Sequence, residues 1–192
     1  MNILISLVAG AVMAPGLTCP VMGHSPAEGG GFTEWNGLHI AYCCAGCATT
    51  FEAEPAKFLK EAKEEGIVIA QSIYDPVSRT AVNRKETEFF SDFEGVRYFF
   101  LSEANMNQFL QEPKTYAKVP KKEVLYCSVM DHGLASYRKA KAYADYEEVR
   151  YYFCCPNCQG AFLEDPNEYV EGVEDKVQEP GVANPENPEE DA

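Results

Sequence analysis

Leu38-His-Ile-Ala-Tyr-Cys-Cys-Ala-Gly-Cys-Ala-Thr-Thr-Phe51 is a stretch that occurs, in altered form, twice more along this chain of 192 residues. It aligns without a gap with Val96-Arg-Tyr-Phe-Phe-Leu-Ser-Glu-Ala-Asn-Met-Asn-Gln-Phe109 and with Val149-Arg-Tyr-Tyr-Phe-Cys-Cys-Pro-Asn-Cys-Gln-Gly-Ala-Phe162. In all three stretches an acidic residue, a proline and then an aromatic residue follow. An internal repeat of this length predicts several copies of one small structural unit.

Each repeat is preceded by a similar short turn, which extends the repeating unit toward the N-terminus. The three turns read Cys19-Pro-Val-Met22, Asp75-Pro-Val-Ser78 and Cys127-Ser-Val-Met130. The predicted units therefore cover residues 17–66, 72–120 and 124–171, which we name units 1, 2 and 3.

Every unit has the same predicted local structure. Alternating residues before Cys43 indicate a strand, and Asn36-Gly37 or Glu94-Gly95 is typical of the turn of a β-hairpin. Two short helices follow, and the second begins with an acidic residue and proline. The sequence thus predicts an α+β fold of tandem hairpin-and-helix units. We expect the units to pack together, because each alone would have a marginal core.

Aligning the units also gives predictions for individual side chains. Aromatic residues recur at the positions of Tyr42 and Phe51, so we expect them to form the cores. His39 is matched by Arg97 and Arg150, which indicates a solvent-facing basic position rather than a metal ligand.

The two ends of the chain differ in composition from the units. Residues 1–14 are nearly all apolar, end in small residues and are too short to span a bilayer. They predict a signal peptide and an exported, periplasmic protein. The alternatives are a buried N-terminal strand or a misassigned start, and a cytoplasmic location stays open. Residues 172–192 are acidic and poor in apolar residues, which predicts a disordered tail. The formal net charge of −14 argues against nucleic acid as a ligand.

All eight cysteines lie in units 1 and 3, with four in each. In both units one cysteine on the N-terminal turn is followed, beyond the hairpin, by a Cys-Cys-x-x-Cys cluster at the start of a helix. This arrangement can bring a distant thiolate to the cluster and close a tetrahedral sulfur site for one metal ion per unit. The predicted ligands are Cys19, Cys43, Cys44 and Cys47 in unit 1, and Cys127, Cys154, Cys155 and Cys158 in unit 3.

Methionine and histidine recur at matching positions after the first cysteine of each cluster. They are Met22 and His24 in unit 1, and Met130 and His132 in unit 3. Thiolate, thioether and imidazole together suit a soft or borderline ion such as Cu(I) or Zn(II). The alternative is that the methionines fill core space and the histidines cap a turn.

Unit 2 is an internal control because it has lost every candidate ligand. At the six corresponding positions it carries Asp75, Ser78, Thr80, Leu101, Ser102 and Asn105. Joint loss is expected if the six residues serve one shared purpose. Because the aromatic residues and the proline remain, we expect a unit of this kind to pack without metal.

The motifs of units 1 and 3 resemble the YHS and TRASH group of metal-binding domains. The resemblance rests on Cys19-Pro-Val-Met22, Tyr42-Cys-Cys-Ala-Gly-Cys47 and Glu54-Pro55, with the matching residues of unit 3. It implies a treble-clef-like unit made of a knuckle, a hairpin and a helix, and a role in handling heavy metals. In the TRASH pattern the ligands would be Cys19, Cys43, Cys47, Cys127, Cys154 and Cys158. Cys44 and Cys155 would then be extra thiols that could supply a fourth ligand.

The sequence therefore predicts a protein that binds copper or zinc in metal handling, delivery or resistance, and that is not an enzyme. A metal transporter or a metalloenzyme is the expected type of protein partner. Two alternatives stay open. The cysteines could form disulfides or hold structural zinc in an interaction module, or each Cys-x-x-Cys could perform thiol–disulfide exchange.

Overall fold

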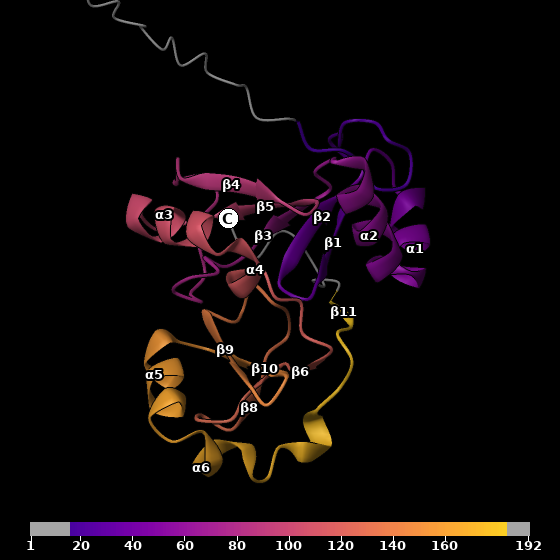
Figure 1. The fold of residues 1–192 in the computed structure, drawn as a ribbon. Coiled ribbons are helices and arrows are strands. Elements are labelled where there is room, and N and C mark those ends of the chain that lie inside the picture. Colours follow the sequence, from indigo (N-terminus) through magenta and orange to yellow (C-terminus); the bar gives the residue numbers. More distant parts are fainter. Residues whose placement is uncertain (1–15, 184–192) are drawn as a thin grey trace, which may run out of the picture.

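The computed structural model describes residues 16–183, so the predicted signal peptide at residues 1–14 lies outside the described residues. The chain combines helices and strands (Figure 1), which confirms the predicted α+β class. Within residues 16–183, none of the helices is both long and apolar enough to cross a membrane. The elements are β1 (Phe32–Trp35), β2 (Leu38–Ala41), α1 (Gly46–Ala53), α2 (Pro55–Glu65), β3 (Ala70–Ser72), β4 (Phe90–Phe93), β5 (Val96–Phe99), α3 (Glu103–Gln111), α4 (Pro113–Tyr116), β6 (Lys122–Val124), β7 (Tyr126–Cys127), β8 (His132–Gly133), β9 (Ala142–Tyr146), β10 (Val149–Phe153), α5 (Pro156–Glu164), α6 (Pro166–Val170), the 3-10 helix η1 (Glu174–Lys176) and β11 (Val182–Ala183).

A hairpin followed by two helices occurs in each of the three segments. Units 1, 2 and 3 contribute β1–β2–α1–α2, β4–β5–α3–α4 and β9–β10–α5–α6. The predicted hairpin turns Asn36–Gly37 and Glu94–Gly95 both have positive φ at both residues, the conformation that favours glycine. Unit 3 turns at Glu147–Glu148 with φ values of 48° and 65°, although neither residue is glycine.

One sheet joins units 1 and 2. Its strand order is β11-β1-β2-β3-β5-β4, in which β3 pairs antiparallel with β2 and parallel with β5. A single apolar core contains residues of both units, among them Trp35, Ile40, Phe51, Phe100 and Phe109. Units 1 and 2 therefore cannot be separated without exposing a shared core.

Unit 3 has its own sheet and core, and a further apolar cluster connects it to the rest of the chain. Its sheet has the order β6-β10-β9. The connecting cluster joins Tyr74, which follows β3, to Tyr137, Tyr143 and Tyr152. Figure 1 shows unit 3 below the six-stranded sheet, with β11 returning to that sheet at the end of the described chain. The predicted packing of the units against one another is confirmed.

The basic position that the units share does not face solvent, which corrects our prediction. In each hairpin it lies opposite an acidic residue; the pairs are Glu34 with His39, Asp92 with Arg97 and Asp145 with Arg150. Both arginines form ion pairs with these neighbours at 2.7 Å, and Arg150 is buried over the ring of Tyr143. The sequence alignment identified equivalent positions, but it did not show that the opposite strand supplies a carboxylate to each arginine.

Unit 1 differs from this pattern because its acidic residue pairs with a cation from unit 3. Glu34 is fully buried and forms an ion pair with Arg138. The guanidinium of Arg138 also lies 2.9 Å from Nδ1 of His39 and 4.7 Å from the ring centre of Phe32. Burial raises the pKa of Glu34, and Arg138 opposes this shift. Burial, with Arg84 and Arg138, lowers the pKa of His39 to about 3, so this imidazole is neutral at neutral pH.

The acidic C-terminal segment is ordered beyond residue 172, where we predicted a disordered tail. Val173 is buried in the core of unit 3, and β11 pairs with β1. Trp35 Nε1 donates a hydrogen bond to the carbonyl of Pro180 at 3.1 Å. These contacts depend on strands and a core supplied by distant parts of the chain, which composition does not describe. Residues 184–192 lie outside the described residues.

Replacing Arg138 with methionine should destabilise the fold and steepen the pH dependence of its stability. The change leaves the buried Glu34 carboxylate without its cation, at a cost of about 3 kcal/mol near neutral pH. Because the folded-state pKa of Glu34 is raised, its contribution to stability is fully present below the unfolded pKa and is lost as pH rises through the folded pKa. Without Arg138 this loss should grow, and urea unfolding across the acidic to neutral range measures it.

The control for this experiment is the double variant Glu34→Gln/Arg138→Met. It has no carboxylate at this position, so the additional pH dependence should disappear. Equal pH dependence in the native chain and in Arg138→Met would show that Arg138 does not compensate the charge of Glu34.

Candidate metal centres

A backbone turn of one kind carries the first candidate residue of every unit. The N–H of Cys19 donates to the carbonyl of His24 at 2.7 Å, and that of Asp75 donates to the carbonyl of Thr80 at 2.9 Å. In unit 3, β7 pairs Cys127 with His132 at the same offset. The residue before the second partner has positive φ in each unit; these residues are Gly23, Arg79 and Asp131. The turn therefore forms whether its first residue is cysteine or aspartate.

In unit 1 the turn places Cys19 beside the cysteines at the start of α1. The sulfur atoms of Cys19, Cys43 and Cys47 all lie within 4.8 Å of one another, and those of Cys43 and Cys47 are 3.9 Å apart. Cys19 and Cys47 are buried, whereas Cys44 is exposed, with its sulfur 3.3 Å from that of Cys47. The four predicted ligands of unit 1 are thus brought together as free thiols, with Cys44 on the solvent side.

Unit 3 assembles its cysteines at the equivalent place but groups them differently. Cys154, Cys155 and Cys158 form one group within 4.8 Å, and Cys127, His132 and Cys154 form another. The sulfur of Cys158 lies 3.7 Å from that of Cys154 and 2.9 Å from that of Cys155. Because Cys154 belongs to both groups, all four thiols and one imidazole are contiguous.

The sulfur spacing fits a tetrahedral metal ion. With metal–sulfur bonds of about 2.3 Å, two thiolates on one metal are about 3.8 Å apart. The distances of 3.9 Å between Cys43 and Cys47 and of 3.7 Å between Cys154 and Cys158 lie close to this value. Cys44 and Cys155 lie nearer to the last cysteine of their clusters, so they would have to separate slightly from it to join the same ion.

Each cluster combines a buried thiol whose pKa is raised with a more accessible thiol whose pKa is lowered. Burial raises the pKa of Cys47 to about 12, and it raises the pKa of Cys158 as well. Hydrogen bonds from Cys47 and Cys158 lower the pKa of Cys44 and Cys155, respectively. Several thiolates in so small a volume repel one another, and a bound cation would remove this obstacle to their ionisation. The donor set of both units therefore fits a soft or borderline metal ion.

The recurring methionines and histidines are placed less uniformly than the cysteines. His132 belongs to the group with Cys127 and Cys154, whereas His24 belongs to none of the candidate ligand groups found among residues 16–183. Met22 and Met130 are 54% and 60% exposed, so neither fills core space, which corrects that interpretation. Both thioethers are exposed on the turns that carry the first cysteines.

In unit 2 the residues at the ligand positions hydrogen-bond to one another. Asp75 takes the place of the first cysteine, and Leu101 and Asn105 take the places of the second and fourth. Oδ2 of Asp75 accepts from the N–H of Leu101 at 2.9 Å and from the side-chain amide of Asn105 at 2.6 Å. Oδ1 accepts from the N–H groups of Val77 and Ser78 at 2.8 and 3.2 Å. A buried carboxylate thus connects the turn to the start of α3, where units 1 and 3 use thiols.

Sequence reasoning missed this arrangement because it treated the six substitutions as losses. Ser102, at the position of Cys44 and Cys155, caps α3 by accepting from the N–H of Asn105 at 3.2 Å. Asp75 aligns with Cys19 and Asn105 aligns with Cys47. An acid and an amide at these two positions are the signal from which the hydrogen bond could have been predicted.

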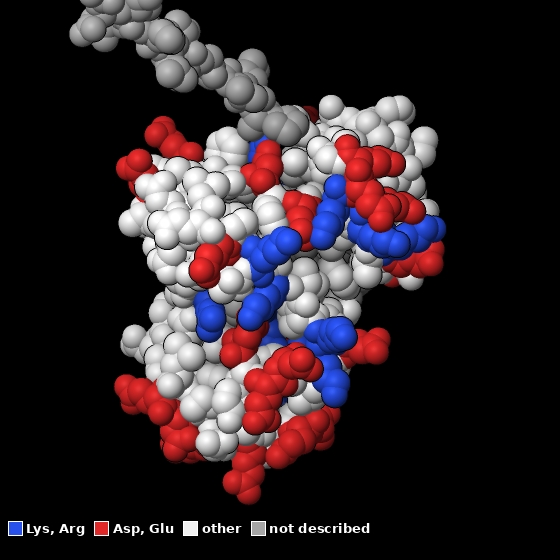
Figure 2. Space-filling model, in the orientation of Figure 1, with Lys and Arg blue, Asp and Glu red and all other residues white. Residues whose placement is uncertain are grey.

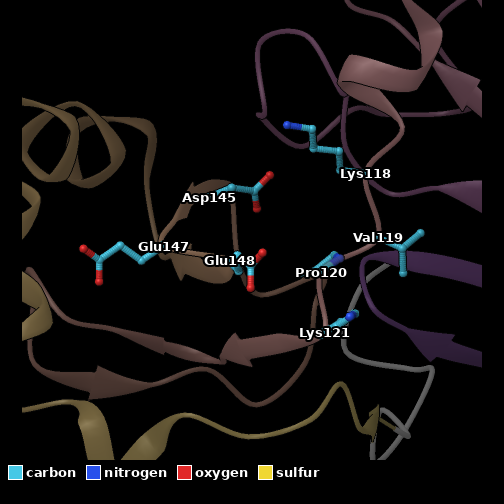
Figure 3. A pocket seen from close by; sticks show the side chains of 7 residues that line it. All are labelled: Lys118, Val119, Pro120, Lys121, Asp145, Glu147 and Glu148. Carbon is cyan, nitrogen blue, oxygen red and sulfur yellow. The ribbon is translucent and has the colours of Figure 1, made fainter.

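An open depression of about 500 Å³ lies where the segment after α4 meets the β9–β10 turn (Figure 3). Figure 3 shows Asp145, Glu147 and Glu148 on the hairpin side and Lys118 on the opposite side. Asp145 is already paired with Arg150. The residues that line this depression include neither cysteine nor histidine, so it is separate from the thiol clusters.

Comparison with protein families identifies a match to the YHS domain over residues 73–119. The matched segment coincides with unit 2, the unit without cysteines, and does not include units 1 and 3. No curated protein and no solved structure matches the chain. The match supports a relationship to the YHS family, but it does not support our prediction of three copies with a degenerate middle one.

Replacing Asp75 with alanine should lower the free energy of unfolding by about 3 kcal/mol, because several partly buried donors lose a charged acceptor. Asp75→Asn keeps the shape and one acceptor oxygen, so it should cost less. Urea unfolding measures the stability of both Asp75 variants. Glu61→Ala, on the exposed face of α2, is the control because it also removes one carboxylate. If Asp75→Ala behaved like Glu61→Ala, Asp75 would not hold the turn to the helix.

Proposed function

We propose that this chain binds soft or borderline metal ions through the thiols of units 1 and 3, and that it acts in metal handling rather than in catalysis. The observation that carries the proposal is the convergence of four thiols in each of two units. In both units the thiols come from a turn and a helix start that are distant in the sequence. Convergence at equivalent positions of two units is expected for a ligand site that both units retain.

We infer that the three units are copies of one module. Because the YHS domain matches unit 2, that module would be a YHS domain. The same turn, hairpin and pair of helices recur around the ligand positions of all three units. Under this interpretation units 1 and 3 are the metal-binding members, and the treble-clef-like description applies to each. Unit 2 replaces the metal with the hydrogen bonds of Asp75.

The chemistry of the ligands favours Cu(I) or Zn(II). Thiolates are the preferred ligands of Cu(I) and also bind Zn(II), while imidazole suits Zn(II). The compact group of Cys19, Cys43 and Cys47 contains sulfur alone, whereas His132 brings an imidazole to the cluster of unit 3. One metal ion per cysteine-bearing unit is the stoichiometry that this ligand set supports.

Exchangeable metal is favoured over a purely structural role. Unit 2 packs in the same way with a carboxylate in place of thiols, so the architecture does not depend on a metal. In units 1 and 3, Cys44 is exposed and Cys155 is partly exposed, which gives an incoming ligand access to each cluster. This access supports metal delivery or resistance. A metal transporter or a metalloenzyme as the protein partner, and an exported location, are further parts of the proposal that rest on the sequence.

Thiol–disulfide exchange is the second candidate function. The sulfur atoms of Cys155 and Cys158 are 2.9 Å apart at the N-terminus of α5, and this placement lowers the pKa of an attacking thiol. A dithiol of this kind could reduce an external disulfide to two thiols while forming the Cys155–Cys158 disulfide, and two external thiols could restore the dithiol in the reverse exchange.

The chain purified under anaerobic conditions should hold about two metal ions. Cys19→Ser and Cys127→Ser should each remove about one, and the double variant should bind none tightly, because a serine hydroxyl is a poor ligand for soft metals. Elemental analysis with a free-thiol count measures this, and competition with a Cu(I) chelator then distinguishes Cu(I) from Zn(II).

Leu101→Ser is the matched control, since Leu101 is exposed and occupies in unit 2 the position of Cys43. It should leave the metal content unchanged. Absence of both metal and free thiols would indicate disulfides and contradict the metal-binding proposal. Metal-free, reduced protein that is reversibly oxidised at Cys155 and Cys158 would favour thiol exchange instead.

A further inference from the structure

Positive charge is concentrated on parts of this acidic chain. On the face drawn in Figure 2, lysine and arginine side chains gather across the middle of the molecule, and acidic side chains lie both among them and toward the two ends. A separate depression of about 600 Å³ is lined by the cationic side chains of Arg84, Lys85, Arg138 and Lys141. The described residues that line it include no aspartate or glutamate, although the formal net charge of the whole chain is −14.

The guanidinium of Arg138 is held in place from several sides. It pairs with the buried carboxylate of Glu34, lies against the ring of Phe32 and is 2.9 Å from Nδ1 of the neutral His39. A guanidinium fixed in this way loses little further conformational freedom when it binds a ligand.

Arg84 is held beside Arg138 by a neutral partner. Its Nη1 donates to Oε1 of Gln71 at 3.0 Å. Burial and the neighbouring Arg138 lower the pKa of Arg84 to about 10, and Glu34 opposes this shift. The two guanidiniums therefore share the field of one buried carboxylate. Partly buried positive charge that exceeds the negative charge beside it is unfavourable unless an anion balances it.

Two lysines extend the positive charge to the rim of the depression. Nζ of Lys141 donates to the carbonyl of Arg138 at 3.2 Å, and Lys85 is exposed beside Arg84. The N–H of Lys85 donates to Oδ1 of Asn83 at 3.1 Å, which fixes the turn that presents both Arg84 and Lys85.

We propose that this depression binds a small oxyanion with two or more negative charges, held by Arg84 and Arg138 with Lys85 and Lys141 at the rim. Guanidinium groups match the paired oxygen atoms of phosphate and carboxylate groups, and fixed arginines at a partly buried site are typical of their recognition. The site is independent of the thiol clusters, because none of its lining residues is a cysteine.

The same chemistry has a second source within this chain. Ala183, the last described residue, pairs across the strands with Glu34, whose carboxylate forms the ion pair with Arg138. The residues that follow include the acidic side chains of Glu186, Glu189, Glu190 and Asp191. Carboxylates share with phosphate the oxygen chemistry that arginines bind, so the experiment has to distinguish these two sources of anion.

Titration of the full chain with inorganic phosphate at constant ionic strength, followed by calorimetry, tests the proposal. We expect saturable binding that Arg84→Gln weakens by about ten-fold or more, since a charged hydrogen-bonding partner is lost. Lys85→Gln/Lys141→Gln should weaken it less. Lys57→Gln/Lys60→Gln, which removes the same charge from the exposed surface of α2, is the control and should leave the affinity unchanged.

A second chain carrying Glu186→Gln, Glu189→Gln, Glu190→Gln and Asp191→Asn identifies the source of the anion. Tighter phosphate binding in this chain than in the native one would show that the C-terminal carboxylates occupy the depression, and equal binding would show that the site is open to free anions. Absence of saturable binding in both chains, or equal weakening by the α2 control, would overturn the proposal. The metal content of every variant should stay at the native value, which separates this outcome from that of the metal-binding proposal.

Discussion

The contact between the first residue of each turn and the start of the following helix is the constraint on which all three units depend. The turn itself is fixed by backbone hydrogen bonds, but its attachment to the helix requires a side chain that reaches across the end of the hairpin. Cysteine and aspartate both have the length to do so. A cysteine at this position adds its sulfur to a group of thiols that a metal can bind. The carboxylate of Asp75 instead accepts hydrogen bonds from Leu101 and Asn105. One architecture can therefore support a metal site or do without it.

The contacts between units place these sites in one continuous body. The shared sheet and core join units 1 and 2, and the tyrosine cluster joins unit 3 to the segment after β3. The ion pair of Glu34 with Arg138 adds a charged contact between units 1 and 3. Unit 2 thus contacts both thiol-bearing units through apolar residues. The same packing brings Arg84 next to Arg138 and creates the basic depression.

Some of the candidate site followed directly from the sequence. Cys19 and the Cys-Cys-x-x-Cys cluster are separated by a hairpin, and a hairpin returns the chain to its starting point, so their convergence was predictable. The Cys-Cys-x-x-Cys cluster spans only a few residues, so its position at the start of a helix could also be predicted from the sequence. The sequence did not reveal that Met22 and Met130 are exposed or that His132, but not His24, joins the thiols. Those outcomes depend on side-chain orientation within the turn, which the residue pattern does not specify.

The sequence by itself determined the α+β class, the recurring order of hairpin and helices and the eight candidate thiols, because periodicity, turn residues and motif spacing act over a few neighbouring residues. Only the tertiary structure decided which charges meet. Arg138 lies 104 positions after Glu34 in the numbering and belongs to a different unit, and residues 172–183 are ordered by strands and a core formed far earlier in the chain. Such contacts have no local signature, since burial and the position of a partner are set by how the units pack.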